Sequence, residues 1–385
     1  MDAITLYAAP MSMYSGKVRA YFRKQGIAFN EVMPGHPSYG EKIIPQTKRG
    51  IVPVVELADG TVLQDTVDII DHFEQSGQAK FSVYPKTPKQ HLAALIIDLF
   101  GSEGLLKVAM HYRWNFLEHN KAFIELEFGD HIAPGAGPDV VRQVAEKVMK
   151  PMQAYLPLLG INEATIPAIE AQYLELLALL NKHFEQHPYL FGGQPCVADY
   201  SLMAPLYAHL SRDPYPGMIM KSQAQRVYRW VERMNAENAD MPEYPGYPQQ
   251  LFTDDEIPAT LQAILSLIAK DFLPEVTCMV NEINQWLDNN PVEEGQCVTE
   301  KPRVKCIKQM DYPFRGNTIT GMVIPYQLYM LQRITDYFDR CEQGDKSQVE
   351  TFLTELDLQD FLLLKAQRRV ERPRLIEVWG EAQDD

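Results

Sequence analysis

The segment Gly50–Glu74, GIVPVVELADGTVLQDTVDIIDHFE, decides the fold. An apolar, β-branched run at its start predicts a strand, and Asp59-Gly60 predicts a hairpin turn into a second strand because this pair reaches positive φ cheaply. The spacing of the apolar residues after Asp65 predicts an amphipathic helix. Pro53 is unexpected, because a proline removes a ladder hydrogen bond from a strand.

The residues before this segment complete a small α/β unit. ITLYAA (4–9) and AFNEVM (28–33) have the β-branched and aromatic content of strands. SGKVRAYFRKQG between them predicts a helix that begins at Ser15 as its N-cap and stops at Gly26. YGEKIIPQTKRG (39–50) is irregular with one helical turn. The order β-α-β-α-β-β-α therefore fills residues 1–82, the first predicted domain.

The remaining chain is mostly helical. We expect an all-helical domain over 86–250, closed by the proline-rich stretch 240–258, and a mostly helical extension over 251–385. Cys196 and Asp199 have the spacing of a capping box that begins one helix of the second domain. In the extension, we expect a helix over about 258–289, an irregular charged stretch to about 316 and two further helices, with Pro325 kinking the first of these two.

Composition excludes several classes of protein. The net charge of −15 argues against nucleic acid or an anionic membrane as a partner, since both select basic surfaces. The five cysteines are not spaced for zinc, so we expect reduced thiols in a cytoplasmic protein and no metal. MDAITLYAAP begins with an acid where a secretory signal is basic, and we expect no such signal.

Four motifs in order resemble the glutathione S-transferase superfamily. LYAAPMSMYSGKVRAYFRKQGI is similar to its first strand, active-site turn and first helix, and GIVPVVE to its strand with a cis-proline. QDTVDII is similar to the acidic-hydroxyl pair that opens the third helix, and YLFGGQPCVADYSL to a helix-capping segment of the second domain. The resemblance implies a thioredoxin-like domain followed by a helical one, with glutathione as co-substrate. It covers neither 105–160 nor 250–385.

The resemblance also implies how glutathione is held. A cis bond before Pro53 turns the backbone of Val52 outward, where its N–H and C=O pair with the cysteinyl backbone of glutathione. The N-terminus of the helix after Asp65 and the Thr66 hydroxyl suit the γ-glutamyl carboxylate, and Asp65 suits the amine. The family's Asn-Pro before this strand is replaced by Thr47-Lys48. The glycine carboxylate then needs another cation, for which Lys48 is our candidate, with Arg49 and Lys42 as alternatives.

A hydroxyl near the end of the first strand would stabilise the glutathione thiolate, which is the reactive form. Ser12 stands where serine-type members have their serine, and Tyr14 and Tyr7 are alternatives. No cysteine is nearby, which disfavours disulfide-exchange chemistry.

A second substrate would lie between the domains. We expect Met11, Tyr14, His111, Tyr112 and Trp114 to form its pocket. An aromatic stripe of this kind is also typical of a core.

The sequence thus predicts an enzyme that activates glutathione for attack on a small electrophile. The alternative is a non-enzymatic interaction or assembly module that keeps the transferase fold and uses its extension. Many members of the family are two-fold dimers, so we expect a homodimer. The basic stretch Lys301, Arg303, Lys305, Lys308 and Arg315 is either a solvated strand-like face or a site for an anion or partner.

Overall fold

The N-terminal unit is built on a four-stranded sheet. The computed structural model describes residues 4–301, 304–373 and 375–383. The strands are β1 (Ile4–Tyr7), β2 (Phe29–Val32), β3 (Val54–Glu56) and β4 (Val62–Gln64), in the order β2-β1-β3-β4. β2 is parallel to β1, and β3 and β4 follow antiparallel. With α1 (Met13–Gln25), α2 (Ile44–Thr47) and α3 (Thr66–Gln75), this confirms the predicted thioredoxin-like arrangement.

The start of α1 differs from the prediction. Ser12, not Ser15, is the N-cap, because the Ser12 hydroxyl accepts the backbone N–H of Ser15 at 3.3 Å. The buried Ser15 hydroxyl instead accepts the N–H of Ala9 and fixes the turn after β1. Gly26 ends the helix with a φ of 67°, as its position predicts.

The second part of the chain is all-helical, as predicted. Asp199 accepts the N–H of Cys196 at 3.0 Å, which confirms the predicted capping contact. The buried ion pair Lys17–Asp98, 2.7 Å long, joins α1 to the first helix of this part. Its elements are α4 (Pro88–Leu99), η2 (Phe100–Gly104), α5 (Leu106–Trp114), α6 (Leu117–Ile132), α7 (Pro138–Gln153), η3 (Pro157–Leu159), α8 (Ile166–His183), α9 (Val197–Ala208), α10 (Pro214–Gln223) and α11 (Gln225–Asn235).

The extension contains hairpins as well as helices. Its helices are α12 (Ala259–Asp271), α13 (Leu273–Asn289), α14 (Pro325–Arg340), α15 (Gln343–Glu355) and α16 (Asp360–Leu363). β5 (Lys308–Phe314) pairs with β6 (Asn317–Val323), and β7 (Arg368–Glu371) with β8 (Val378–Ala382). Pro325 begins α14, so the predicted mid-helix kink is wrong: the residues before it form a strand. Of the basic stretch, Arg303 lies outside the described residues.

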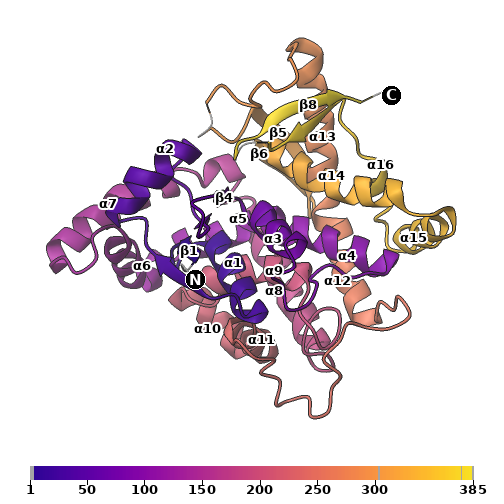
Figure 1. The fold of residues 1–385 in the computed structure, drawn as a ribbon, viewed down its shortest axis with the longest axis horizontal. Helices are drawn as coiled ribbons and strands as arrows, with labels where there is room; N and C mark the ends of the chain where they lie inside the picture. Colours follow the sequence, from indigo (N-terminus) through magenta and orange to yellow (C-terminus); the bar gives the residue numbers. More distant parts are fainter. Residues whose placement is uncertain (1–3, 302–303, 374, 384–385) are drawn as a thin grey trace.

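The extension packs on the first two parts rather than standing apart. Figure 1 shows it, in orange and yellow, over α3 and α4. α4 contacts α9, α12, α14 and α15, so helices of the extension cover much of its surface. A single cluster of buried apolar side chains runs from Leu6 in β1 to Trp379 in β8. Among the described helices, none is long and apolar enough to cross a membrane.

Candidate active site at one edge of the sheet

Three of the predicted motifs meet at one edge of the sheet. In the strand register, Tyr7 pairs with Val54, and Val54 pairs with Gln64. β1 and β4 end at this row, and β3 begins there. The loops that leave the row carry Ser12, Val52-Pro53 and Asp65-Thr66. We call residues 8–12, 51–53 and 64–66 the site edge.

The Val52–Pro53 peptide bond is cis, as the sequence predicts. Pro53 is buried and Val52 is half-buried. The Val52 side chain packs against the apolar cluster that includes Ala9 and Met11. The loop before β3 and the turn after β1 therefore meet in one apolar cluster.

Asp65 is the N-cap of α3, and its Oδ1 accepts the N–H of Val67 at 2.9 Å. Its φ is 89°, a backbone conformation that residues other than glycine seldom adopt. Such conformations are often found at functional sites. Thr66, the first residue of α3, is buried. The Oε1 atom of neighbouring Gln64 is buried without a hydrogen-bond donor among the described residues. This edge therefore holds one buried acceptor without a donor, which suits a ligand with an ammonium or amide group.

The three candidate hydroxyls have different surroundings. Ser12 is half-buried, and its hydroxyl accepts one N–H while donating to no described residue. Tyr14 donates to the Ser102 carbonyl at 3.1 Å and lies 3.4 Å from Glu103 Oε1. Burial and the Glu103 carboxylate raise the pKa of Tyr14 well above its usual value.

The Tyr7 hydroxyl lies 3.0 Å from Glu56 Oε2 and 3.2 Å from Ser38 Oγ. Burial raises its pKa. Among the described residues, the hydroxyls of Tyr14 and Tyr7 have hydrogen-bond acceptors, whereas the Ser12 hydroxyl has none.

Glu103 is a neighbour of the site that the sequence analysis missed. It lies in the π-helical turn η2 between α4 and α5, and burial raises its pKa to about 7. π-helical turns are frequent at functional sites. The available signal was an acidic residue between Gly101 and Gly104 in an otherwise apolar stretch.

The predicted second-substrate residues separate into two groups. Met11 and Trp114 share an apolar cluster on α5, α6 and α7 that borders Val52. The structure does not bring His111 and Tyr112 there. His111 lies 3.0 Å from Glu170 of α8, and the Tyr112 ring packs on Tyr173 of the same helix. Tyr112 lies about 200° around α5 from Trp114 and so on the opposite face. His111, three residues before Trp114, is held toward α8 by its contact with Glu170.

Arg113, which the sequence analysis passed over, holds the turn after β1. Its guanidinium forms two hydrogen bonds to Asp213, of 2.7 and 2.8 Å, and donates to the Met11 carbonyl at 3.1 Å. Both side chains are buried. A single arginine inside the aromatic run HYRWNF was the signal for such a buried role.

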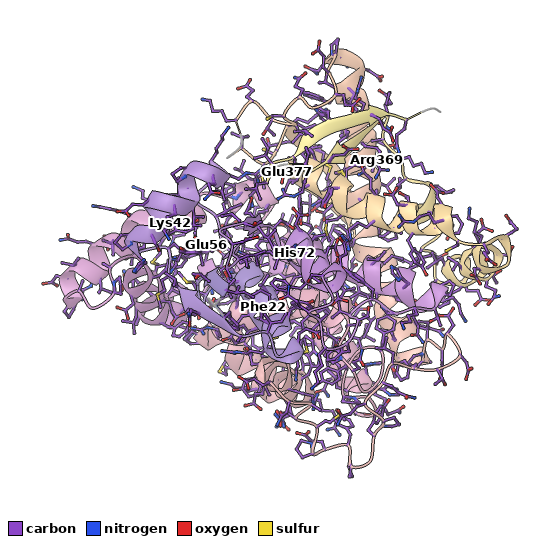
Figure 2. The ribbon with its side chains drawn as sticks, viewed as in Figure 1. Phe22, Lys42, Glu56, His72, Arg369 and Glu377 are labelled. Carbon is purple, nitrogen blue, oxygen red and sulfur yellow. The ribbon has the colours of Figure 1, made fainter. Side chains whose placement is uncertain are left out.

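The three cations proposed for the glycine carboxylate differ in exposure and in ion pairing. Lys48 is exposed, with a φ of 55°. Arg49 is buried and paired with Glu377 of the extension, while Lys42 lies 3.7 Å from Glu56. Figure 2 labels Lys42, Glu56 and Glu377 and shows Glu377 on the side of the extension that faces the N-terminal unit. Lys48 is thus the one of the three without an ion-pair partner among the described residues.

The extension reaches the site edge directly. Tyr326 of α14 donates to Asp65 Oδ1 at 2.7 Å. Arg372, after β7, donates to the Gln64 carbonyl at 3.1 Å and pairs with Asp68 and Glu377. No sequence signal pointed to these two residues, because their partners are 261 and 308 positions away in the chain.

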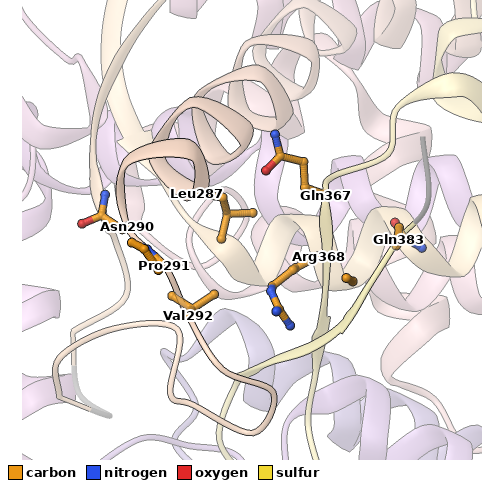
Figure 3. Close-up of a pocket in the computed structure, with 8 residues that line it drawn as sticks. Leu287, Asn290, Pro291, Val292, Gln367, Arg368 and Gln383 are labelled. Carbon is orange, nitrogen blue, oxygen red and sulfur yellow. The ribbon is translucent and has the colours of Figure 1, made fainter.

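The other features that could hold a ligand lie elsewhere. A pocket of about 520 Å³ lies inside the extension, between the end of α13 and the β7-β8 hairpin (Figure 3). None of its lining residues belongs to the site edge. Within the described ranges, no group of three or more histidine, cysteine or acidic side chains is arranged to hold a metal ion.

Comparison with known proteins agrees with this geometry. Residues 6–80 match the family "Glutathione S-transferase, N-terminal domain", and residues 143–238 match "Glutathione S-transferase, C-terminal domain". No curated protein sequence matches the chain.

Solved structures with a similar arrangement include a glutathione S-transferase from Rhodospirillum rubrum, with 11% identity, a TM-score of 0.38 and 67% of this chain and 97% of that one covered. The β-etherase LigF from Sphingobium has 18% identity, a TM-score of 0.43 and 62% and 97% coverage. At these values the structural likenesses add nothing to the family match. Residues 6–80 and 143–238 therefore match, in order, both domains of the glutathione S-transferase superfamily.

Proposed function

We propose that this protein is a glutathione transferase that binds glutathione at the site edge and activates its thiol for attack on a small electrophile. The observation that carries the proposal is the row Tyr7–Val54–Gln64, from which all three glutathione motifs leave the sheet together. Family membership supports the same general activity.

In the proposed complex, the backbone of Val52 pairs with the cysteinyl unit of glutathione. The γ-glutamyl carboxylate lies at the N-terminus of α3, with the Thr66 hydroxyl, because a helix N-terminus favours an anion. The Asp65 carboxylate takes the ammonium. Lys48 is the proposed partner of the glycine carboxylate, and its exposed position supports this role.

Ser12 is the proposed activating group. Its hydroxyl proton is free to donate to the thiolate, whereas Tyr14 and Tyr7 have acceptors already. A hydrogen bond to the anion lowers the pKa of the bound thiol. The thiolate then attacks the electrophile, forming a carbon–sulfur bond as the leaving group departs. Met11 and Trp114 are the proposed apolar contacts of that substrate.

Binding of glutathione by the full chain, measured by calorimetry, tests the proposal. Asp65→Ala should weaken the affinity about 10- to 100-fold, the scale of one charge-assisted hydrogen bond. Asp59→Ala is the matched control, since Asp59 accepts the Thr61 N–H in the hairpin turn at the other end of β4. Equal affinity in the two variants would reject the assignment of Asp65.

The alternative is a non-enzymatic module, and the size of the extension, residues 251–385, is the observation that favours it. Glutathione binding without turnover of any generic electrophile would support it. A cytoplasmic homodimer remains a prediction. Sedimentation of the full chain only at its own mass of 44.0 kDa would contradict the dimer.

A further inference from the structure

Three side chains on α14 of the extension contact three aspartates on α3, and we call these three contacts the seam. Tyr326, Tyr329 and Arg333 lie on one face of α14, and they contact Asp65, Asp68 and Asp71 respectively. The distances are 2.7, 3.0 and 2.6 Å. The aspartates recur every three residues, and the α14 side chains after three and then four, so each set lies on one helix face and the two helices meet in one register. The first pair of this seam falls on the site edge.

A second connection joins the extension to the same edge. Arg372 is buried and donates to the Gln64 carbonyl, Asp68 and Glu377. Glu377 in turn pairs with the buried Arg49, just before Ile51 and Val52. Residues 372 and 377 thus link the loop before β3 to the N-terminus of α3. Both of these segments bind glutathione in the proposed complex.

The Tyr326 contact leaves half of the Asp65 carboxylate available. Oδ1 accepts two hydrogen bonds, from the Val67 N–H and the Tyr326 hydroxyl. Oδ2 accepts none from the described residues. Two donors on one oxygen fix the orientation of the carboxylate and the unusual backbone of Asp65, whose φ is 89°. An ammonium group can then bind Oδ2 without displacing Tyr326.

We propose that the extension completes the glutathione site, with Tyr326 as a positioning residue that holds Asp65 for the γ-glutamyl ammonium. This inference rests on the proposed function. It means that the extension serves binding by the first domain and is not a separate module. Arg372 and Glu377 support the same edge by fixing Gln64 and Arg49.

The test compares two variants of the full chain that each lose one hydroxyl from α14. Tyr326→Phe removes the donor to Asp65, and Tyr329→Phe removes the donor to Asp68, one turn away from the site edge. Glutathione affinity is measured by calorimetry and the thermal midpoint by scanning calorimetry. We expect Tyr326→Phe to raise the dissociation constant about three- to tenfold and Tyr329→Phe to change it less than twofold, with similar midpoints.

A double-mutant cycle makes the test sharper. In the Asp65→Ala background, Tyr326→Phe should have no further effect on affinity, because the side chain that it positions is absent. Equal affinity of wild type and Tyr326→Phe would overturn the inference while leaving glutathione binding intact. Tighter binding by Tyr326→Phe would also overturn it, since the hydroxyl would then compete with the ammonium. Absence of glutathione binding by wild type would instead reject the proposed function, and the inference with it.

Discussion

At the scale of single residues, Ser12 caps α1 and is the proposed donor to the glutathione thiolate. Ser12→Ala should slow turnover at neutral pH about tenfold or more, since a hydrogen bond to a charged group contributes roughly 1.5–3 kcal/mol. Glutathione affinity should change little, because the peptide is held elsewhere. Part of the rate should return at alkaline pH, where solvent forms the thiolate unaided. The measurement is the pH–rate profile with a chlorodinitrobenzene as electrophile.

Loss of the cap itself is the confounding effect in that experiment, at about 1 kcal/mol of stability. Ser12→Thr keeps both the cap and the donor, and its profile should resemble that of wild type. If the profiles of Ser12→Ala and wild type overlay, Ser12 is not the activating group, and Tyr14→Phe and Tyr7→Phe become the next variants.

Glu103 should make the stability of the protein depend on pH. Burial raises its pKa to about 7, above the usual 4.5. The native state therefore binds this proton more tightly than the unfolded state, and the stabilisation is full below about pH 4.5 and lost as the pH rises through 7. Glu103→Gln stays neutral and keeps an acceptor for Tyr14. It should be more stable than wild type by about 2–3 kcal/mol at pH 8 and similar at pH 4.5.

Urea denaturation at the two pH values measures this difference. A Glu103→Gln variant that is no more stable than wild type at pH 8 would contradict a raised pKa of Glu103.

At the scale of secondary-structure elements, the contact between the β7-β8 hairpin and α3 depends on Arg372. Arg372→Met should lower the free energy of unfolding by about 2–4 kcal/mol at pH 8, because Asp68 then keeps only the Tyr329 hydroxyl and Glu377 only Arg49 as partners. Burial already raises the pKa of Asp68 to about 6, so the loss should shrink below that pH, where Asp68 is protonated.

Arg369 is the matched control, since it is in β7 and pairs with the more exposed Asp336. Arg369→Met should cost at most about 1 kcal/mol. Equal costs for the two variants in chemical denaturation would contradict a central role of Arg372.

Element by element, local signals explain which predictions succeeded. Asp59-Gly60 and Gly26 are positions where the backbone needs positive φ or a turn, and both were readable from the sequence. Pro325 was misread because TITGMVIP also contains apolar residues at helical spacing. Residues 317–323 form a strand because β6 pairs with β5 across the Arg315-Gly316 turn. That pairing depends on contacts outside the segment rather than on its own pattern. The exchange of Ser12 for Ser15 as the cap is an error of three residues at a helix end.

At the scale of the whole molecule, the shared core predicts one cooperative unfolding transition. The four tryptophans report on separate parts: Trp114 and Trp230 lie in the helical domain, and Trp286 and Trp379 stack on each other in the extension. A variant with Trp114 and Trp230 changed to phenylalanine reports on the extension through its fluorescence, and one with Trp286 and Trp379 changed reports on the helical domain. In each variant, we expect a single transition in denaturant, with the same slope as in wild type. Two transitions within a single variant would show that the extension unfolds independently.

The contacts between the extension and the site edge could not be predicted from the sequence. The motifs of the site edge lie within residues 8–66, where local patterns and family resemblance both apply. Tyr326 and Arg372 reach that edge from more than 260 residues away, and neither stands in a motif. Side-chain contacts of this length follow from packing and leave no periodic signal in a single sequence.

We propose that glutathione binds at the site edge while the extension stays packed on α3. A crystal structure of the full chain with bound glutathione would show whether it does. In that structure we expect the cysteinyl backbone against Val52, the sulfur within hydrogen-bonding distance of Ser12 Oγ, the ammonium on Asp65 and the Tyr326–Asp65 hydrogen bond intact. Glutathione bound away from these residues, or bound only with α14 displaced from α3, would contradict it.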